Sequence, residues 1–221
     1  MSFFSPTSLI AILVAVSVHE WAHAFAAYRL GDPTAKYSGR MTLNPLAHLD
    51  PVGTILFVLV GFGWGKPVPI DPRYFKNYKR DAALTALAGP FSNLVLALAA
   101  FALGKILGIG PQVLADSGVL MAPENAPVIL TFLGELLGDL VIINLILMAF
   151  NLLPIAPLDG SKIVQPWIPV RYDDLYDEFM RRGPWILLAI IVAERAFNFP
   201  FLSYWIAIIT TPILGLMHAV L

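Results

Sequence analysis

The chain has 221 residues, of which 58% are hydrophobic and only 13% are charged, and its formal net charge is −1. Soluble domains carry about 25% charged residues, so this chain has too little charge to cover the surface of a soluble domain. It has no cysteine and no net positive charge, which excludes a disulfide-stapled secreted domain and argues against nucleic-acid binding. The composition therefore predicts an all-α polytopic protein whose environment is the lipid bilayer.

Residues 6–28 form the first predicted spanning helix and contain the pattern H-E-x-x-H at residues 19–23. Residues four positions apart lie on one helix face, so the two histidines can hold one metal ion, and Glu20 lies beside that face. A carboxylate inside an apolar helix is costly without a partner, so ionisable residues there are expected to be functional. The simpler alternative is a histidine-rich helix end at the interface, with Glu20 paired to Arg29.

The next apolar segment, residues 52–62, is too short to span a bilayer as a helix. It is dense in glycine and β-branched residues, which favours β-like backbone. Irregular backbone is tolerated within a membrane only where protein or water satisfies its polar groups. We therefore expect residues 52–70 to form a short re-entrant β-like loop. Residues 82–107, rich in Ala and Leu, form the second predicted spanning helix.

A longer apolar tract, residues 127–168, contains the pattern N-x-x-P-x-x-P-L-D-G at residues 151–160. Pro154 and Pro157 break the helix because proline has no backbone N–H to donate. Asp159 follows the break, and a buried carboxylate at this place is costly unless it binds a metal. A turn at the membrane surface with a solvated Asp159 explains the motif equally well on its own.

Residues 184–221 hold two apolar runs divided at Asn198 and Pro200, which predict a C-terminal transmembrane hairpin. Lys and Arg are concentrated in residues 29–81 and 162–182, so the positive-inside rule places both stretches in the cytoplasm. The first helix then runs inward, the second outward and the third inward, and the hairpin goes out and returns.

This topology predicts that the ionisable residues meet. If residues 127–138 lie along the outer interface, the third span covers about residues 140–166. His19, His23 and Asp159 then lie at one depth, nearer the cytoplasmic side. A catalytic zinc site needs three protein ligands and one open position, and these residues would supply the three.

These motifs resemble those of the site-2 protease family of intramembrane zinc metalloproteases over about residues 10–165. The resemblance rests on H-E-W-A-H at 19–23, the proline-containing motif at 151–160 and G-x-x-x-N at 89–93. The segment 61–69 is similar to the family's membrane re-entrant β loop. The chain resembles the compact form of the family, without a PDZ domain between the second and third core helices and without a nucleotide-sensing domain after the C-terminus.

The resemblance implies a catalytic core at residues 1–168, followed at 169–221 by a cytoplasmic connector and the transmembrane hairpin. It implies one zinc ion per chain and hydrolysis of peptide bonds in or near transmembrane segments of membrane-anchored substrates. The zinc ligands would be His19, His23 and Asp159, with Glu20 as the base that activates water. The implied contacts to the substrate backbone are Asn151, Pro154 and Pro157.

Two alternatives accompany this interpretation. A membrane zinc transporter, or a zinc-binding protein without hydrolytic activity, would use the same ligands but would not need a base beside the metal. Asn93 is interpreted as a residue that makes a helix–helix hydrogen bond, an ordinary packing feature of membrane helices. His48 and Asp50 are interpreted as parts of a loop near the headgroups, in which Asp50-Pro51 starts a turn.

Overall fold

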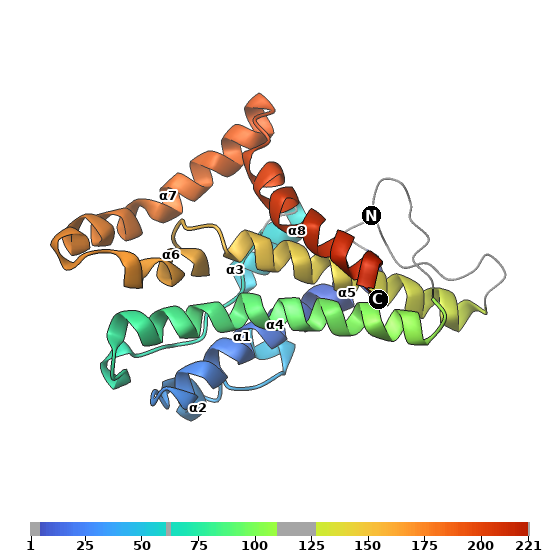
Figure 1. Ribbon diagram of the computed structural model, residues 1–221, viewed down its shortest axis with the longest axis horizontal. Helices are drawn as coiled ribbons and strands as arrows, with labels where there is room; N and C mark the ends of the chain where they lie inside the picture. Colours follow the sequence, from blue (N-terminus) through green and yellow to red (C-terminus); the bar gives the residue numbers. More distant parts are fainter. Residues whose placement is uncertain (1–4, 61–62, 110–126, 221) are drawn as a thin grey trace.

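The computed structural model describes residues 5–60, 63–109 and 127–220, and the regular elements of this part of the chain are all helical (Figure 1). The longer helices are α1 (Pro6–Arg29), α3 (Pro51–Val60), α4 (Tyr78–Ile106), α5 (Val128–Asn151), α7 (Asp173–Phe197) and α8 (Phe201–Val220). The shorter helices are α2 (Thr34–Tyr37) and α6 (Asp159–Ile163), with 3-10 turns at Pro45–Ala47, Pro72–Tyr74, Gln165–Trp167 and Val170–Tyr172. The all-α architecture predicted from the composition is confirmed.

Four of the described helices are long and apolar enough to cross a membrane: α1, α4, α5 and residues 201–219 of α8. The first two match the spans predicted at 6–28 and 82–107. Helix α4 packs on α5 through a cluster that includes Phe101 and Leu145. Small residues at the interfaces, such as Ala11 and Ala15 of α1, let the helix backbones approach closely.

Contacts at two depths give the directions of the core helices. Ser8 Oγ of α1 donates to Asp139 Oδ2 of α5 at 2.9 Å, and further along both chains His19 lies next to Asp159. Helices α1 and α5 therefore run the same way, as the positive-inside reading predicts. Helix α4 runs the opposite way, because Asn93 contacts His19 whereas the earlier residue Thr85 contacts His23.

The third span differs from its predicted bounds. Helix α5 is continuous from Val128 to Asn151, so the expectation that residues 127–138 lie along the interface and that the span covers 140–166 is wrong. The helix ends before Pro154 and Pro157 because neither residue can donate the backbone hydrogen bond that continuation requires. Asp159 lies beyond this break as the first residue of α6, and it still reaches the depth of the histidines.

The β-like backbone predicted for residues 52–60 is also wrong, because this segment is helix α3. Asp50 starts the helix, since its Oδ1 accepts from Gly53 N at 2.8 Å, and Pro51 occupies the first turn, where its missing N–H costs nothing. This outcome confirms that Asp50-Pro51 starts a turn. Among the described residues after α3, the chain is non-helical from 63 to 71 and makes an isolated antiparallel bridge between Leu49 and Gly65. Residues 61 and 62 of the predicted loop lie outside the described part of the chain.

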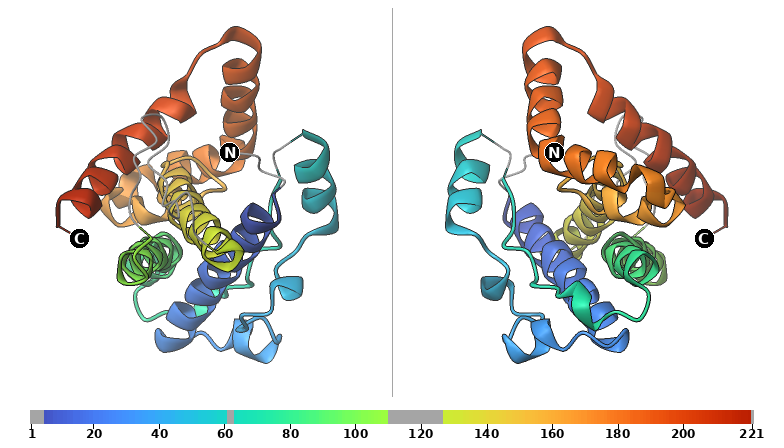
Figure 2. Two further views of the ribbon diagram at one scale, coloured as in Figure 1. Left: turned by 90° about the vertical axis from the view of Figure 1, so that its right-hand side faces the viewer. Right: turned by 90° about the vertical axis from the view of Figure 1, so that its left-hand side faces the viewer.

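The C-terminal part is a helical hairpin, but its path through the membrane differs from the predicted one. Of its two helices, only α8 is long and apolar enough to cross. Trp205 Nε1 near the start of α8 donates to Ala149 O at the end of α5, whereas His218 makes an edge-to-face contact with Phe101 near the end of α4. Helix α8 thus runs antiparallel to α5, whereas a returning hairpin would make these two helices parallel. Figure 2 shows α7 and α8 as a V beside the bundle.

Candidate metal centre

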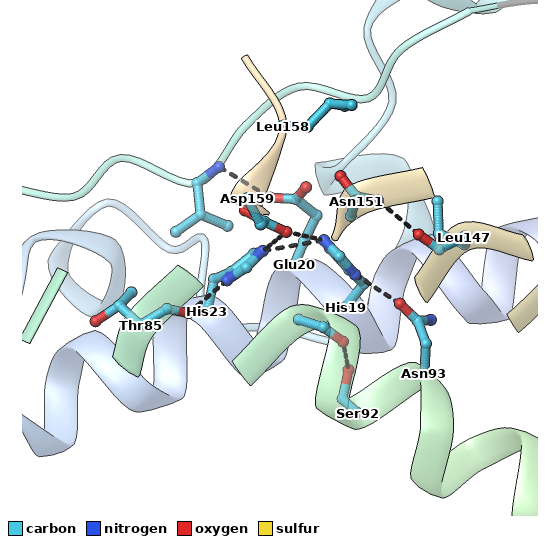
Figure 3. Close-up of polar contacts among 12 residues, drawn as sticks. His19, Glu20, His23, Thr85, Ser92, Asn93, Leu147, Asn151, Leu158 and Asp159 are labelled. Atoms are coloured by element: carbon cyan, nitrogen blue, oxygen red, sulfur yellow. Dashed lines mark hydrogen bonds and ion pairs between the residues drawn. The ribbon is translucent and has the colours of Figure 1, made fainter. Parts of the chain in front are cut away.

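Three potential metal ligands converge where α1 meets the first turn of α6 (Figure 3). His19 and His23 lie one turn apart on α1, and their Nε2 atoms are 3.0 Å apart. Asp159 places Oδ2 3.2 Å from each of these nitrogens. Both histidines are buried, with 5% and 7% of their surface exposed. The structure therefore brings together the three residues that the sequence analysis expected to meet.

The spacing of these atoms fits a tetrahedral zinc ion. Bonds of about 2.0–2.1 Å to nitrogen and oxygen, at tetrahedral angles, separate neighbouring ligand atoms by about 3.3 Å. In the described part of the chain, no hydrogen bond satisfies the buried atom Asp159 Oδ2. A buried carboxylate oxygen that faces two imidazole nitrogens without a hydrogen bond is costly, and a cation between the three atoms would remove that cost.

Each imidazole makes a second contact, through Nδ1, to helix α4. His23 Nδ1 lies 2.7 Å from Thr85 O, and His19 Nδ1 lies 2.6 Å from Asn93 Oδ1. A backbone carbonyl can only accept a hydrogen bond, so neutral His23 carries its proton on Nδ1 and keeps the Nε2 lone pair free. Contacts of this kind on the far ring nitrogen fix the orientation of metal-binding histidines.

Helix α4 comes closest to the imidazoles at Gly89. A Cβ at this position would lie within 3.0 Å of ring atoms of both His19 and His23. Asn93 lies one turn further along the same face of α4, where it reaches His19. The G-x-x-x-N pattern therefore supplies the space for the rings and one of the hydrogen bonds that orient them.

Glu20 lies beside the ligand cluster without being part of it. Its Oε2 accepts a hydrogen bond of 3.0 Å from Val68 N, in the extended segment that follows α3. The side chain points toward the same space as the imidazoles and Asp159 (Figure 3). A carboxylate that is oriented next to a metal site but does not fill a ligand position is placed to accept a proton from water.

The predicted substrate-binding residues lie at the break between α5 and α6. Asn151 is the last residue of α5, and its Nδ2 donates to Leu147 O of the same helix at 3.0 Å. Figure 3 shows its side chain near Glu20 and Asp159. Pro154 and Pro157 are exposed on the break. The contact of these three residues with a substrate stays a prediction.

Sequence reasoning missed the residues that support the histidines. Asn93 makes the helix–helix hydrogen bonds expected of it, to Ala15 O and to Asn144, but its Oδ1 also contacts His19, which the sequence analysis did not expect. Asn144 was not singled out, although a polar side chain inside an apolar helix was the available signal. Thr85 acts through its backbone carbonyl, which every residue has, so the sequence carries no signal for it. His48 is not part of the cluster: it is fully buried, and its Nε2 lies 2.8 Å from Thr42 O.

A bundle of apolar helices that encloses two histidines, an aspartate and a neighbouring glutamate defines the class of membrane metalloproteases. The model of the family described as "Peptidase family M50" matches residues 7–193, and the chain belongs to this family, the site-2 proteases. No solved structure matches the chain significantly.

Curated relatives carry the name "Putative zinc metalloprotease". YwhC of Bacillus subtilis (strain 168) is 41% identical over 165 residues, which are 74% of this chain and 70% of the relative. Rip2 of Mycolicibacterium smegmatis is 31% identical over 160 residues, 70% of this chain and 54% of the relative. Rip2 of Mycobacterium tuberculosis (strain H37Rv) is 31% identical over 161 residues, with the same two shares. The chain thus matches about half the length of the Rip2 proteins.

Proposed function

We propose that the protein is an intramembrane zinc metalloprotease that hydrolyses peptide bonds in or near transmembrane segments of membrane-anchored substrates. The observation that carries this proposal is the convergence of His19, His23 and Asp159 with Glu20 beside them, inside apolar helices. His19, His23 and Asp159 would hold one zinc ion per chain. When bound, zinc acts as a Lewis acid that polarises a carbonyl and acidifies a coordinated water.

Glu20 is the general base of the proposed reaction. It takes a proton from the attacking water and later donates it to the amine that leaves the cleaved peptide bond. The hydrogen bond from Val68 N to Glu20 Oε2 fixes the direction of the carboxylate. A metal transporter has no use for a base held in this way, so this contact favours hydrolysis over transport of zinc.

The substrate must be unwound before it can react, because helical hydrogen bonds shield its backbone. Asn151, at the end of α5, would hydrogen-bond the opened backbone next to Glu20. Pro154 and Pro157 keep the break that follows Asn151 free of regular helix and exposed. An extended substrate segment could also pair with the non-helical chain between residues 63 and 71, which already makes one antiparallel bridge at Gly65.

The proposed site lies nearer the cytoplasmic side of a cell membrane. The ligands lie toward the C-terminal end of α1, and the basic stretch that follows it at residues 29–81 faces the cytoplasm by the positive-inside rule. Water would enter from this side, where the basic stretch at residues 29–81 lies.

The experiment uses the full chain in lipid vesicles with a fluorogenic transmembrane peptide and measures zinc content and cleavage together. We expect about one zinc per chain, loss of cleavage after chelation, and recovery on addition of zinc. Zinc flux into the same vesicles distinguishes the transporter. Zinc flux without cleavage, or cleavage that is unaffected by complete removal of the metal, would overturn the proposal.

A further inference from the structure

Behind His19, a chain of two buried asparagines connects the metal centre to helix α5. His19 Nδ1 lies 2.6 Å from Asn93 Oδ1, and Asn93 Nδ2 donates to Asn144 Oδ1 at 2.7 Å. Asn144 Nδ2 in turn donates to Leu140 O on its own helix at 2.7 Å. Both asparagines are completely buried. The three side chains come from α1, α4 and α5, so this series of hydrogen bonds connects all three helices.

The last acceptor in this chain determines the direction of every hydrogen bond before it. Leu140 O can only accept, so Asn144 must direct its Nδ2 toward it and its Oδ1 toward Asn93. Asn93 must then donate through Nδ2, which also lies 3.3 Å from Ala15 O, another acceptor. This leaves Asn93 Oδ1 to face His19, where it accepts the proton of Nδ1.

We propose that Asn144 is a positioning residue of the metal centre: by orienting the Asn93 amide, it holds His19 in the Nδ1-protonated form. In this form the Nε2 lone pair of His19 is free and points toward His23 and Asp159. His23 reaches the same state through a single carbonyl, Thr85 O, whereas His19 depends on two amides in sequence. The expected effect of Asn144 on zinc affinity rests on the proposed function, but its effect on which ring nitrogen of His19 is protonated does not.

The chain of amides explains why two polar side chains are retained inside apolar helices. A polar group in this environment is costly unless it is fully hydrogen-bonded, and helix packing alone would be served by leucine at position 144. Asn144 donates one hydrogen bond to Leu140 O and accepts one from Asn93, and both are needed to fix the direction of the hydrogen bonds that lead to His19. Removal of a residue that helps to orient a metal ligand typically lowers metal affinity by about 10- to 100-fold.

Two substitutions at position 144 separate positioning from packing. Asn144→Leu has nearly the same shape but no acceptor, so the Asn93 amide loses its fixed direction. Asn144→Asp keeps an oxygen that accepts from Asn93 Nδ2, so the direction of the Asn93 amide is kept. Ser17→Ala is the matched control: it removes a buried hydroxyl on α1 whose one hydrogen bond among the described residues goes to the backbone O of Leu13.

Two measurements on the full-length protein in detergent test the proposal. Competition with a chromophoric chelator gives the zinc affinity, which should fall about 10- to 100-fold in Asn144→Leu and stay within about threefold of wild type in Asn144→Asp and Ser17→Ala. Nitrogen NMR of ¹⁵N-histidine in the metal-free protein at alkaline pH reads the protonated ring nitrogen of His19. We expect Nδ1–H in wild type and Asn144→Asp, and a mixture of both forms in Asn144→Leu.

An Nε2-protonated His19 in the wild-type protein would overturn the proposal, whether or not the variants fold. Unchanged zinc affinity and an unchanged His19 signal in folded Asn144→Leu would overturn it as well, and so would equal losses in Asn144→Leu and Asn144→Asp. Failure of the wild-type protein to bind zinc would instead contradict the proposed function, and the NMR signal would still decide the role of Asn144.

Discussion

The candidate metal centre consists of four ionisable side chains, and each is a residue type that apolar helices normally exclude. His19, Glu20 and His23 follow the helical period of α1, and Asp159 follows a proline break. Their immediate neighbours on α4 leave space for the imidazoles at Gly89 and supply a backbone acceptor at Thr85 and a side-chain acceptor at Asn93. Small changes at these neighbours should therefore affect the metal centre without touching a ligand.

Gly89→Ala tests the close approach of α4 to the histidines. The new Cβ would collide with ring atoms of His19 and His23, so the rings must move and zinc affinity should fall by about 10- to 100-fold. Chelator competition measures this change. Gly215→Ala on α8 is the control, because a Cβ there meets nothing within 4 Å. Equal zinc affinities for the two variants would contradict the close approach.

Asn151→Leu tests the proposed contact with the substrate backbone. Loss of one hydrogen bond should raise KM by roughly 2- to 10-fold and leave zinc content unchanged, because Asn151 bonds only to Leu147 O within the described protein. Steady-state cleavage of a transmembrane peptide, together with metal analysis, separates the two quantities. A lost zinc ion, or a KM equal to that of wild type, would show that Asn151 has another role.

At this scale the sequence predicts the residues whose spacing is local and misses those whose partners lie on other helices. The pattern H-E-x-x-H reports one helix face, so His19, Glu20 and His23 follow from the period alone. Asn93 and Asn144 gain their meaning only when α1, α4 and α5 are packed together. No pattern within a single segment of the sequence distinguishes such an asparagine from an ordinary packing residue.

At the scale of elements, the break between α5 and α6 is held in place by the C-terminal hairpin. Tyr176 of α7 donates its hydroxyl to Ser161 O at 2.7 Å, and burial raises the pKa of Tyr176 to about 12, which keeps this donor protonated. Gly183 of α7 packs against Ala156. The hairpin thus supports the short segment that carries Asp159.

Gly183→Ala tests this support. Its Cβ would overlap the side chain and backbone of Ala156, and overpacking of this kind costs about 1–3 kcal/mol. We expect a lower thermal midpoint in detergent and weaker zinc binding, because Asp159 moves with the break. Wild-type values for both quantities would mean that α7 does not support the site.

The sequence predicted helices α1 and α4 correctly from the length of their apolar segments, but it mispredicted residues 52–60, where the prediction relied on local β propensity. Helices α1 and α4 match their predicted spans, because about 20 apolar residues in a bilayer leave few alternatives. The β-branched residues of 52–60 suggested a β-like loop, but the Asp50 cap and Pro51 start a helix there. Capping outweighed propensity in this short segment.

At the scale of the whole molecule, four helices form the membrane-crossing part that the structure describes, and α8 runs antiparallel to α5. The end of α8 near residue 219 then lies on the opposite side of the membrane from α2. The predicted hairpin placed both on the cytoplasmic side, because it counted α7 as a crossing helix.

Cysteine labelling measures this arrangement directly, since the chain has no cysteine of its own. A membrane-impermeant thiol reagent applied to intact cells should label Ala219→Cys but not Lys36→Cys, and permeabilised cells should show both. The reason is that exposed position 36 follows the end of α1, whereas exposed position 219 is the last residue of the α8 span, at the opposite end of the bundle. Protection of both cysteines in intact cells would contradict this arrangement and support the predicted hairpin, in which α7 and α8 both cross the membrane.

The most direct test of the central claim is the substitution Glu20→Gln, measured for zinc content and for cleavage in the same preparation. Glutamine keeps the shape of Glu20 but cannot take a proton, so bound zinc should stay the same while cleavage falls at least about 100-fold. Glu135→Gln, on an exposed position of α5, is the control and should match wild type in both. Cleavage by Glu20→Gln at the wild-type rate, or loss of zinc together with activity, would contradict the account.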